Sequence, residues 1–150
     1  MKTIRYITIL LVLLNISCCV NQKQKDEEQI KDTINKYWHS VKENNVKECL
    51  SLFEDVENYS GVVQSDLFFL NKNYDKINPN NILLKNIKIK DTTVMFAENK
   101  QKYVQYMIKK ENDTTYLKKP LIITFMFYKP VGYNKIFNRA VLQNSSNWDK

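Results

Sequence analysis

Apolar residues along the chain change from a helical to a strand-like spacing near residue 82. Between Asp26 and Glu43 they recur every three or four positions, which places them on one stripe covering about 100° of a helix. This pattern predicts an amphipathic helix that buries Ile30, Ile34, Tyr37, Trp38 and Val41. His39, the only histidine, falls nearly opposite the stripe and is expected to face water rather than act as a base.

Two further helices are predicted before the spacing changes. The first runs from Val46 to about Asp55, with Asn45 as its N-cap. A turn at residues 59–61 and a cap at Ser65 then predict another helix over residues 66–77. Its buried face is expected to hold Leu67, Leu70, Tyr74 and Ile77, helped by Phe68 or Phe69.

From Ile82 onward, short alternating runs separated by turn residues are typical of antiparallel strands. The predicted strands are residues 82–84 and 87–90 with a bulge between them, then 93–97, 102–111, 114–118, 121–128 and 133–142. Residues 121–128 are apolar at nearly every position, which favours a central strand covered on both faces. Helices followed by a strand meander predict an α+β fold, with the N-terminal helices packed on a curved antiparallel sheet.

The N-terminus has the layout of a secretory signal. Lys2 and Arg5 precede an apolar run from Tyr6 to Leu14, and the segment closes on Asn15-Ile16-Ser17, with a small residue at its end. The run is too short for a transmembrane helix, which needs about 20 mostly apolar residues. Removal of residues 1–17 from the 150-residue chain leaves 133 residues, the usual size of one domain.

The pair Cys18-Cys19 directly after this segment resembles the lipobox of bacterial lipoproteins. The resemblance implies lipidation at Cys18, with Cys19 as the alternative, and a membrane anchor formed by several acyl chains. Residues 18–27 are then a flexible leader, residues 28–143 the domain and residues 144–150 a polar tail. Lys25-Asp26-Glu27-Glu28 resembles the export signal of Bacteroidetes surface lipoproteins, which implies a place in the cell envelope, at the outer membrane. The alternative interpretation is that these acids lie at the start of a helix, where negative side chains interact favourably with the positive end of the helix dipole.

Composition excludes several classes of site. The two glycines, Gly61 and Gly132, cannot build a phosphate-binding loop, and no Cys or His pair has metal-site spacing, so no cofactor or metal is expected. The second half of the chain is basic, but its lysines are scattered around a single Arg139. These residues are therefore expected on a solvated face, with no nucleic acid as partner. Cys49 is expected to be a buried free thiol.

The order of elements resembles the nuclear transport factor 2-like, or cystatin-like, fold. The resemblance rests on Tyr37-Trp38, on the break at residues 44–45 before Leu50-Ser51-Leu52-Phe53, and on the last two strands, with residues 120–125 and 132–136. It implies a cone whose mouth can hold an apolar ligand. Enzymes of this family, such as ketosteroid isomerase and polyketide cyclases, place an Asp or His base and a Tyr donor inside the cone.

Asp66 is the best-placed carboxylate for such a base, although an acid early in a helix also suits the helix dipole. The candidates for pocket walls are Tyr37, Tyr103, Tyr106 and Tyr128, whose alternative role is to fill core and strand faces. These residues favour a non-enzymatic envelope lipoprotein that binds a small apolar ligand or an envelope protein. The alternatives are an isomerase-like or cyclase-like enzyme and a structural domain that forms a homodimer.

Overall fold

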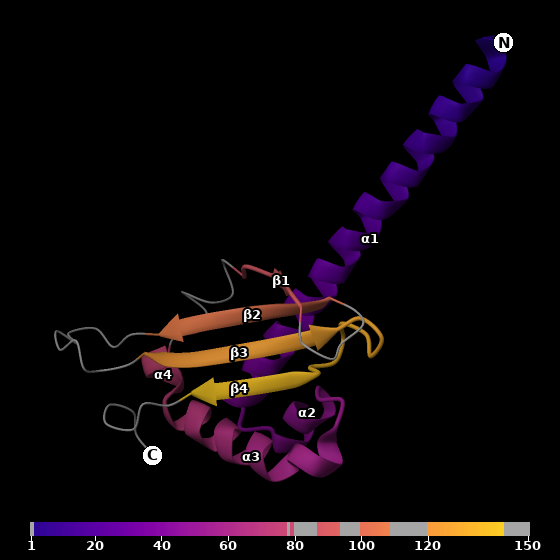
Figure 1. The fold of residues 1–150 in the computed structure, drawn as a ribbon. Coiled ribbons are helices and arrows are strands. Elements are labelled where there is room, and N and C mark those ends of the chain that lie inside the picture. The colour runs from indigo at the N-terminus through magenta and orange to yellow at the C-terminus, as the bar shows by residue number, and fades with distance from the viewer. Residues whose placement is uncertain (1, 78, 80–86, 94–99, 109–119, 143–150) are drawn as a thin grey trace.

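The computed structural model describes residues 2–77, 79, 87–93, 100–108 and 120–142, with side chains described from residue 22 onward. Within these residues, four helices precede a four-stranded antiparallel sheet with strand order β1-β2-β3-β4 (Figure 1). The helices pack with the sheet, so the predicted α+β class is confirmed. The strands predicted at residues 82–84 and 114–118, most of the one at 93–97, and the tail at 144–150 lie outside the described residues.

Helix α1 (Lys2–Lys42) is one continuous rod whose N-terminal half projects from the domain (Figure 1). The predicted helix start at Asp26 is therefore wrong, and residues 18–27, which were predicted as a flexible leader, lie within α1. No Gly or Pro interrupts residues 2–42. In the polar part of the helix, the Gln22 side chain donates a hydrogen bond to Asp26 and the Gln24 side chain to Glu28, each one turn later, and these contacts support the helix there. Helix α1 has 41 residues, but neither it nor any other described helix is both long enough and apolar enough to cross a bilayer.

The predicted stripe of α1 is confirmed, because Ile30, Ile34, Tyr37, Trp38 and Val41 are each at most 1% exposed. His39 is exposed, as predicted. After α1 the chain reverses at Asn44, which has a positive φ of 51°. Helix α2 (Val46–Ser51) follows, and the predicted cap is confirmed: the Asn45 side chain accepts a hydrogen bond from the Glu48 N–H.

Helix α3 (Val56–Lys72) begins well before the predicted start. The Asp55 side chain caps it by accepting from the Asn58 N–H, so the turn predicted at residues 59–61 and the cap predicted at Ser65 are wrong. Gly61 lies inside the helix because one glycine costs a helix only about 1 kcal/mol, which buried neighbours can offset. Of the two phenylalanines left open, Phe69 is buried and Phe68 is half exposed. Helix α4 (Tyr74–Ile77) completes the helical part.

The strands are β1 (Lys90–Thr92), β2 (Gln101–Ile108), β3 (Leu121–Tyr128) and β4 (Asn138–Leu142). The predicted extent of the strand at residues 121–128 is confirmed, whereas the turn predicted at residues 91–92 is wrong because β1 runs through it. Strand β4 starts five residues later than predicted, since residues 129–135 form turns and a bend around Gly132, whose φ is +96°.

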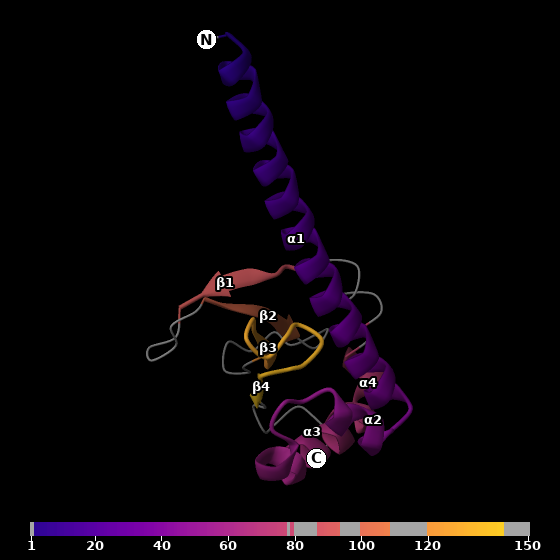
Figure 2. The same ribbon diagram turned by 90° about the vertical axis from the view of Figure 1, so that its right-hand side faces the viewer.

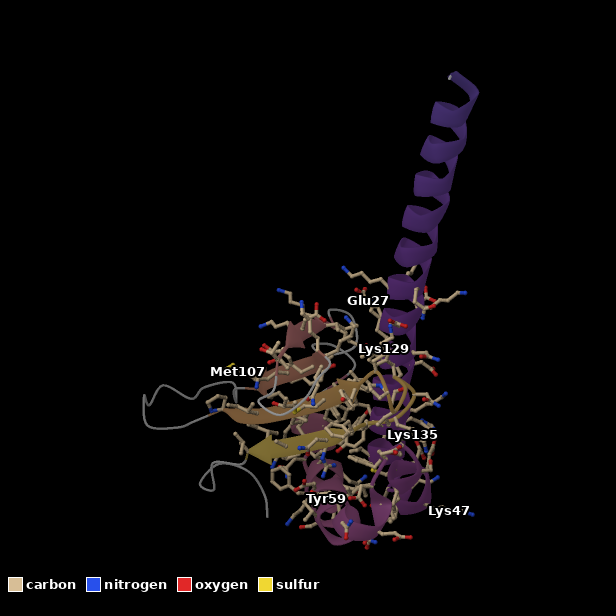
Figure 3. All side chains as sticks on the ribbon, turned by 45° about the vertical axis from the view of Figure 1, so that its right-hand side comes forward. Glu27, Lys47, Tyr59, Met107, Lys129 and Lys135 are labelled. Carbon is tan, nitrogen blue, oxygen red and sulfur yellow. The ribbon has the colours of Figure 1, made fainter. Side chains whose placement is uncertain are left out.

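All four helices lie on one side of the sheet (Figure 2). Leu121, Ile123, Phe125 and Phe127 of β3 point to this side and are fully buried. The alternate residues of β3 are only half buried, so among the described residues the strand is not covered on both faces, contrary to the prediction. Met107 projects from this open face, away from α1, and is 60% exposed (Figure 3).

Candidate functional site

A short backbone connection brings the α2–α3 segment against the chain that enters β4. Phe53 and Ile136 form an isolated parallel bridge. Its hydrogen bonds run from the Ile136 N–H to the Leu52 carbonyl, at 2.7 Å, and from the Glu54 N–H to the Ile136 carbonyl, at 3.1 Å. Residues 53–55 therefore lie beside residues 137–139, although more than 80 positions separate them in the sequence.

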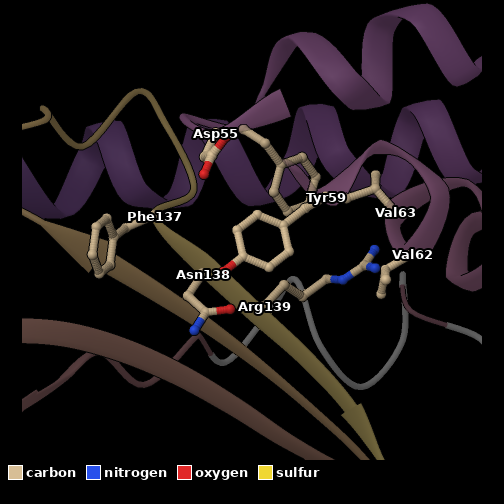
Figure 4. Close-up of a pocket in the computed structure, with 8 residues that line it drawn as sticks. Asp55, Tyr59, Val62, Val63, Phe137, Asn138 and Arg139 are labelled. Atoms are coloured by element: carbon tan, nitrogen blue, oxygen red, sulfur yellow. The ribbon is translucent and has the colours of Figure 1, made fainter. Parts of the chain in front are cut away.

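A pocket opens where these segments meet the first turns of α3 (Figure 4). Its enclosed volume is about 30 Å³, and the empty space among its lining residues is about 320 Å³ when open solvent is included. The lining residues are Phe53, Asp55, Tyr59, Val62, Val63, Phe137, Asn138 and Arg139. Three aromatic rings and three polar side chains thus surround one space.

Arg139 is the most deeply buried charged group at this site. It pairs with Phe125 across β3 and β4, so strand alternation directs its side chain to the helix side of the sheet. The side chain is 2% exposed and its guanidinium carbon lies 5.3 Å from the centre of the Phe53 ring. The prediction that Arg139 lies on a solvated face is therefore wrong. The sequence signal that could have indicated this position is that Arg139 has the same strand phase as Val141, which is half-buried against the core.

Asp66 is the counter-ion of this arginine. Nη2 of Arg139 donates to the Asp66 carboxylate, whose side chain is 16% exposed. Because α3 begins at Val56, Asp66 lies in the second half of the helix, and the dipole explanation for this acid is wrong. Burial raises the pKa of the Asp66 carboxyl above its ordinary value, while the charge and hydrogen bond of Arg139 act in the opposite direction.

The second guanidinium nitrogen holds the hydroxyl of Tyr37. Nη1 of Arg139 donates to Tyr37 Oη at 2.5 Å, and the tyrosine is completely buried. Burial raises the pKa of the Tyr37 hydroxyl, so this group stays protonated at neutral pH. Arg139 thus joins α1, α3 and β4 through one side chain, and the predicted acid and one predicted tyrosine meet at it.

The other predicted pocket tyrosines lie elsewhere. Tyr106 is in the core, with its hydroxyl buried and without a partner within the described residues. Tyr103 and Tyr128 are half-buried on the open face of the sheet, where the Tyr128 ring lies 5.2 Å from the Phe137 ring. None of the four tyrosines, Tyr37 included, lines the pocket described above, whereas Tyr59 does.

The arrangement suits binding better than proton transfer. A general base must carry a carboxylate that is free to accept a proton from a substrate, and the Asp66 carboxylate is occupied by Arg139 and does not line the pocket. Across the described residues, no cluster of three His, Cys, Asp or Glu side chains could hold a metal ion. What remains in the pocket is a set of rings with a few polar atoms, which is the usual composition of a small-molecule site.

Comparisons with known proteins add no relative. No protein-family model matches the chain, and no curated protein or solved structure shows significant similarity to it.

Proposed function

We propose that this protein is a lipid-anchored lipoprotein of the cell envelope whose domain binds a small ligand without chemical conversion. In this proposal the signal segment is removed, Cys18 or Cys19 carries the lipid, and the domain adopts a nuclear transport factor 2-like architecture at the outer membrane. The observation that carries the binding function is the pocket between α3 and β4, because Phe53, Tyr59 and Phe137 offer three rings to one ligand.

The state of Asp66 supports a binding function over the isomerase-like or cyclase-like alternative. An enzyme of that kind needs a carboxylate and a tyrosine hydroxyl that face a substrate together. Here the Asp66 carboxylate and the Tyr37 hydroxyl both face Arg139 instead. Freeing Asp66 for catalysis would leave a buried arginine unpaired, at a cost of several kcal/mol.

Helix α1 changes the form of the proposed tether. It runs without interruption from Cys18 to the first buried core residue, Ile30. At 1.5 Å per residue, twelve helical residues span about 18 Å. A chain lipidated at Cys18 would therefore hold its domain on a short helical stalk at a defined distance from the membrane.

Intact-mass analysis of protein purified from membranes tests the tether. The expected result is loss of residues 1–17 and a mass increase equal to two or three acyl chains. The Cys18→Ser variant should lose the modification, and Cys19→Ser is the matched control that should keep it. An unmodified wild-type N-terminus would refute the lipoprotein proposal, and loss of the modification only in Cys19→Ser would transfer it to Cys19.

Titration with phenol, a water-soluble single ring, tests the pocket. Amide NMR shifts of the full chain in detergent micelles should change around Tyr59 and Asn138, with a Kd of about 1–10 mM for a ligand of seven heavy atoms. Phe137→Ala removes one wall and should weaken binding. Phe68→Ala removes a half-exposed ring of α3 that does not line the pocket, and should bind as the wild type does. Equal shifts in the two variants would refute binding at this pocket.

A further inference from the structure

One polar atom beside the pocket lacks, among the described residues, the hydrogen-bond partner that its neighbours have. Nη1 and Nη2 of Arg139 are engaged by Tyr37 and Asp66, but its Nε is buried and has no hydrogen-bond partner in the described part of the chain. A buried donor without an acceptor costs about 1–3 kcal/mol. An oxygen acceptor placed near Nε would recover this free energy, so the pocket wall offers one strong donor to a ligand.

Charge decides which kind of acceptor fits. Asp66 already neutralises Arg139, and the pocket wall carries one carboxylate, that of Asp55. The Asp55 side chain accepts only from the backbone and side chain of Asn58, and no described Lys or Arg pairs with it. The site therefore carries an uncompensated negative charge, which the positive end of the α3 dipole offsets only in part. A carboxylate or phosphate ligand would be repelled, whereas a neutral oxygen would not.

We infer that the pocket takes a small, uncharged ring compound with a carbonyl oxygen, such as an amide or a ketone, which accepts a hydrogen bond from Arg139 Nε. This inference rests on the proposed binding function and narrows its ligand class. Phe53 and Phe137 pack against the ring of the ligand, and the Asp55 carboxylate accepts from an amide N–H where the ligand has one.

Access to Nε depends on two surface side chains. Tyr59 and Val62 are 56% and 58% exposed, so either side chain can rotate into solvent without unpacking the core. Figure 4 shows the Tyr59 ring beside the Arg139 side chain, with Val62 near the guanidinium end. Displacement of Tyr59 by the ligand ring would exchange one aromatic contact for another and uncover the donor.

Three probes with the same ring separate charge from hydrogen bonding: benzamide, benzoate and benzylammonium. Each is titrated into the full chain in detergent micelles, and the amide shifts of Asn138 and Arg139 give the Kd. Benzamide has a neutral carbonyl oxygen, benzoate a charged acceptor and benzylammonium no acceptor. Benzamide should bind about three- to tenfold more tightly than benzylammonium, because only benzamide can accept a hydrogen bond from Nε. It should also bind more tightly than benzoate, because the Asp55 carboxylate repels an anion. Phe137→Ala should weaken benzamide binding, and Phe68→Ala should not.

The outcomes distinguish this inference from the function on which it rests. Preference for benzamide in the wild type and in Phe68→Ala supports the inference. Equal affinities for the three probes, or preference for benzoate or benzylammonium, would overturn the ligand class while leaving the pocket as a binding site. If no probe shifts these amides, or if Phe137→Ala binds as the wild type does, both the inference and the proposed binding site are wrong.

Discussion

Replacing Arg139 with methionine is the most informative perturbation, because this side chain joins three elements and is 2% exposed. The substitution leaves the Asp66 carboxylate, 16% exposed, without its counter-ion, and leaves the buried Tyr37 hydroxyl without its donor. Removing one partner of a buried ion pair costs about 3–5 kcal/mol. We expect a loss near the lower end, about 3 kcal/mol, because Asp66 retains some contact with water.

A second substitution separates the charge from the packing. Asp66→Leu combined with Arg139→Met removes both charges, so only the unpaired Tyr37 hydroxyl remains as a penalty, at about 1–2 kcal/mol. The double variant should therefore be more stable than Arg139→Met alone, although it carries one more change. Lys129→Met, at an exposed position, is the control and should stay within about 0.5 kcal/mol of the wild type.

The loss caused by Arg139→Met should also depend on pH. Burial raises the pKa of Asp66 and Arg139 opposes this effect, so removing the arginine raises the pKa further. A carboxyl whose pKa is higher in the folded than in the unfolded state destabilises the fold above its folded pKa, and this penalty disappears below the unfolded value of about 3.9. The deficit of Arg139→Met should therefore be smaller at pH 4 than at pH 7.5.

Urea denaturation followed by far-ultraviolet circular dichroism measures these differences. The reasoning is refuted if Arg139→Met costs less than about 1 kcal/mol at pH 7.5, a value typical of exposed ion pairs. It is also refuted if the double variant loses as much as the two single variants together, because the two side chains would then act independently.

Three further predictions follow from burial and capping. Ile123→Ala should lower the free energy of unfolding in urea by about 3 kcal/mol, because Ile123 is fully buried. Met107→Ala on the open face should lower it by less than about 0.5 kcal/mol, and equal losses would show that the two faces are misassigned. Burial raises the pKa of the Cys49 thiol, so this thiol should resist Ellman's reagent in the native protein and react in denaturant. Peptide mass mapping identifies the labelled cysteine, and rapid labelling of Cys49 in the native protein would contradict its burial. Asn45→Ala should cost about 1 kcal/mol through loss of the α2 cap, and an unchanged midpoint would argue against that cap.

Predictions that depend on local periodicity were reliable. The buried stripe of α1, the Asn45 cap and the extent of β3 follow from residues that are neighbours in sequence, so they could be predicted without any knowledge of the partner surface. The helix boundaries around Gly61 and Asp26 could not be predicted in the same way. A glycine and a polar run weaken a helix only modestly, and packing or i,i+4 side-chain contacts override that weakness.

The candidate site was only partly predictable for a different reason. Asp66 could be singled out as a carboxylate near the start of a predicted helix, but its partner lies 73 residues later. The pocket likewise depends on the bridge between Phe53 and Ile136, which joins segments more than 80 residues apart. Local spacing carries no information about such pairings, since they are determined by how helix and strand surfaces fit together.

The sequence by itself determined the α+β class, the apolar face of the first helix and the one strand that forms the centre of the core, because burial of apolar side chains repeats with the period of each element. Only the tertiary structure decided that Arg139 is buried, that Asp66 is neutralised rather than free, and that Tyr59 rather than the predicted tyrosines lines the pocket. A charged side chain enters a protein interior only where a partner meets it, and that meeting depends on the path of the whole chain.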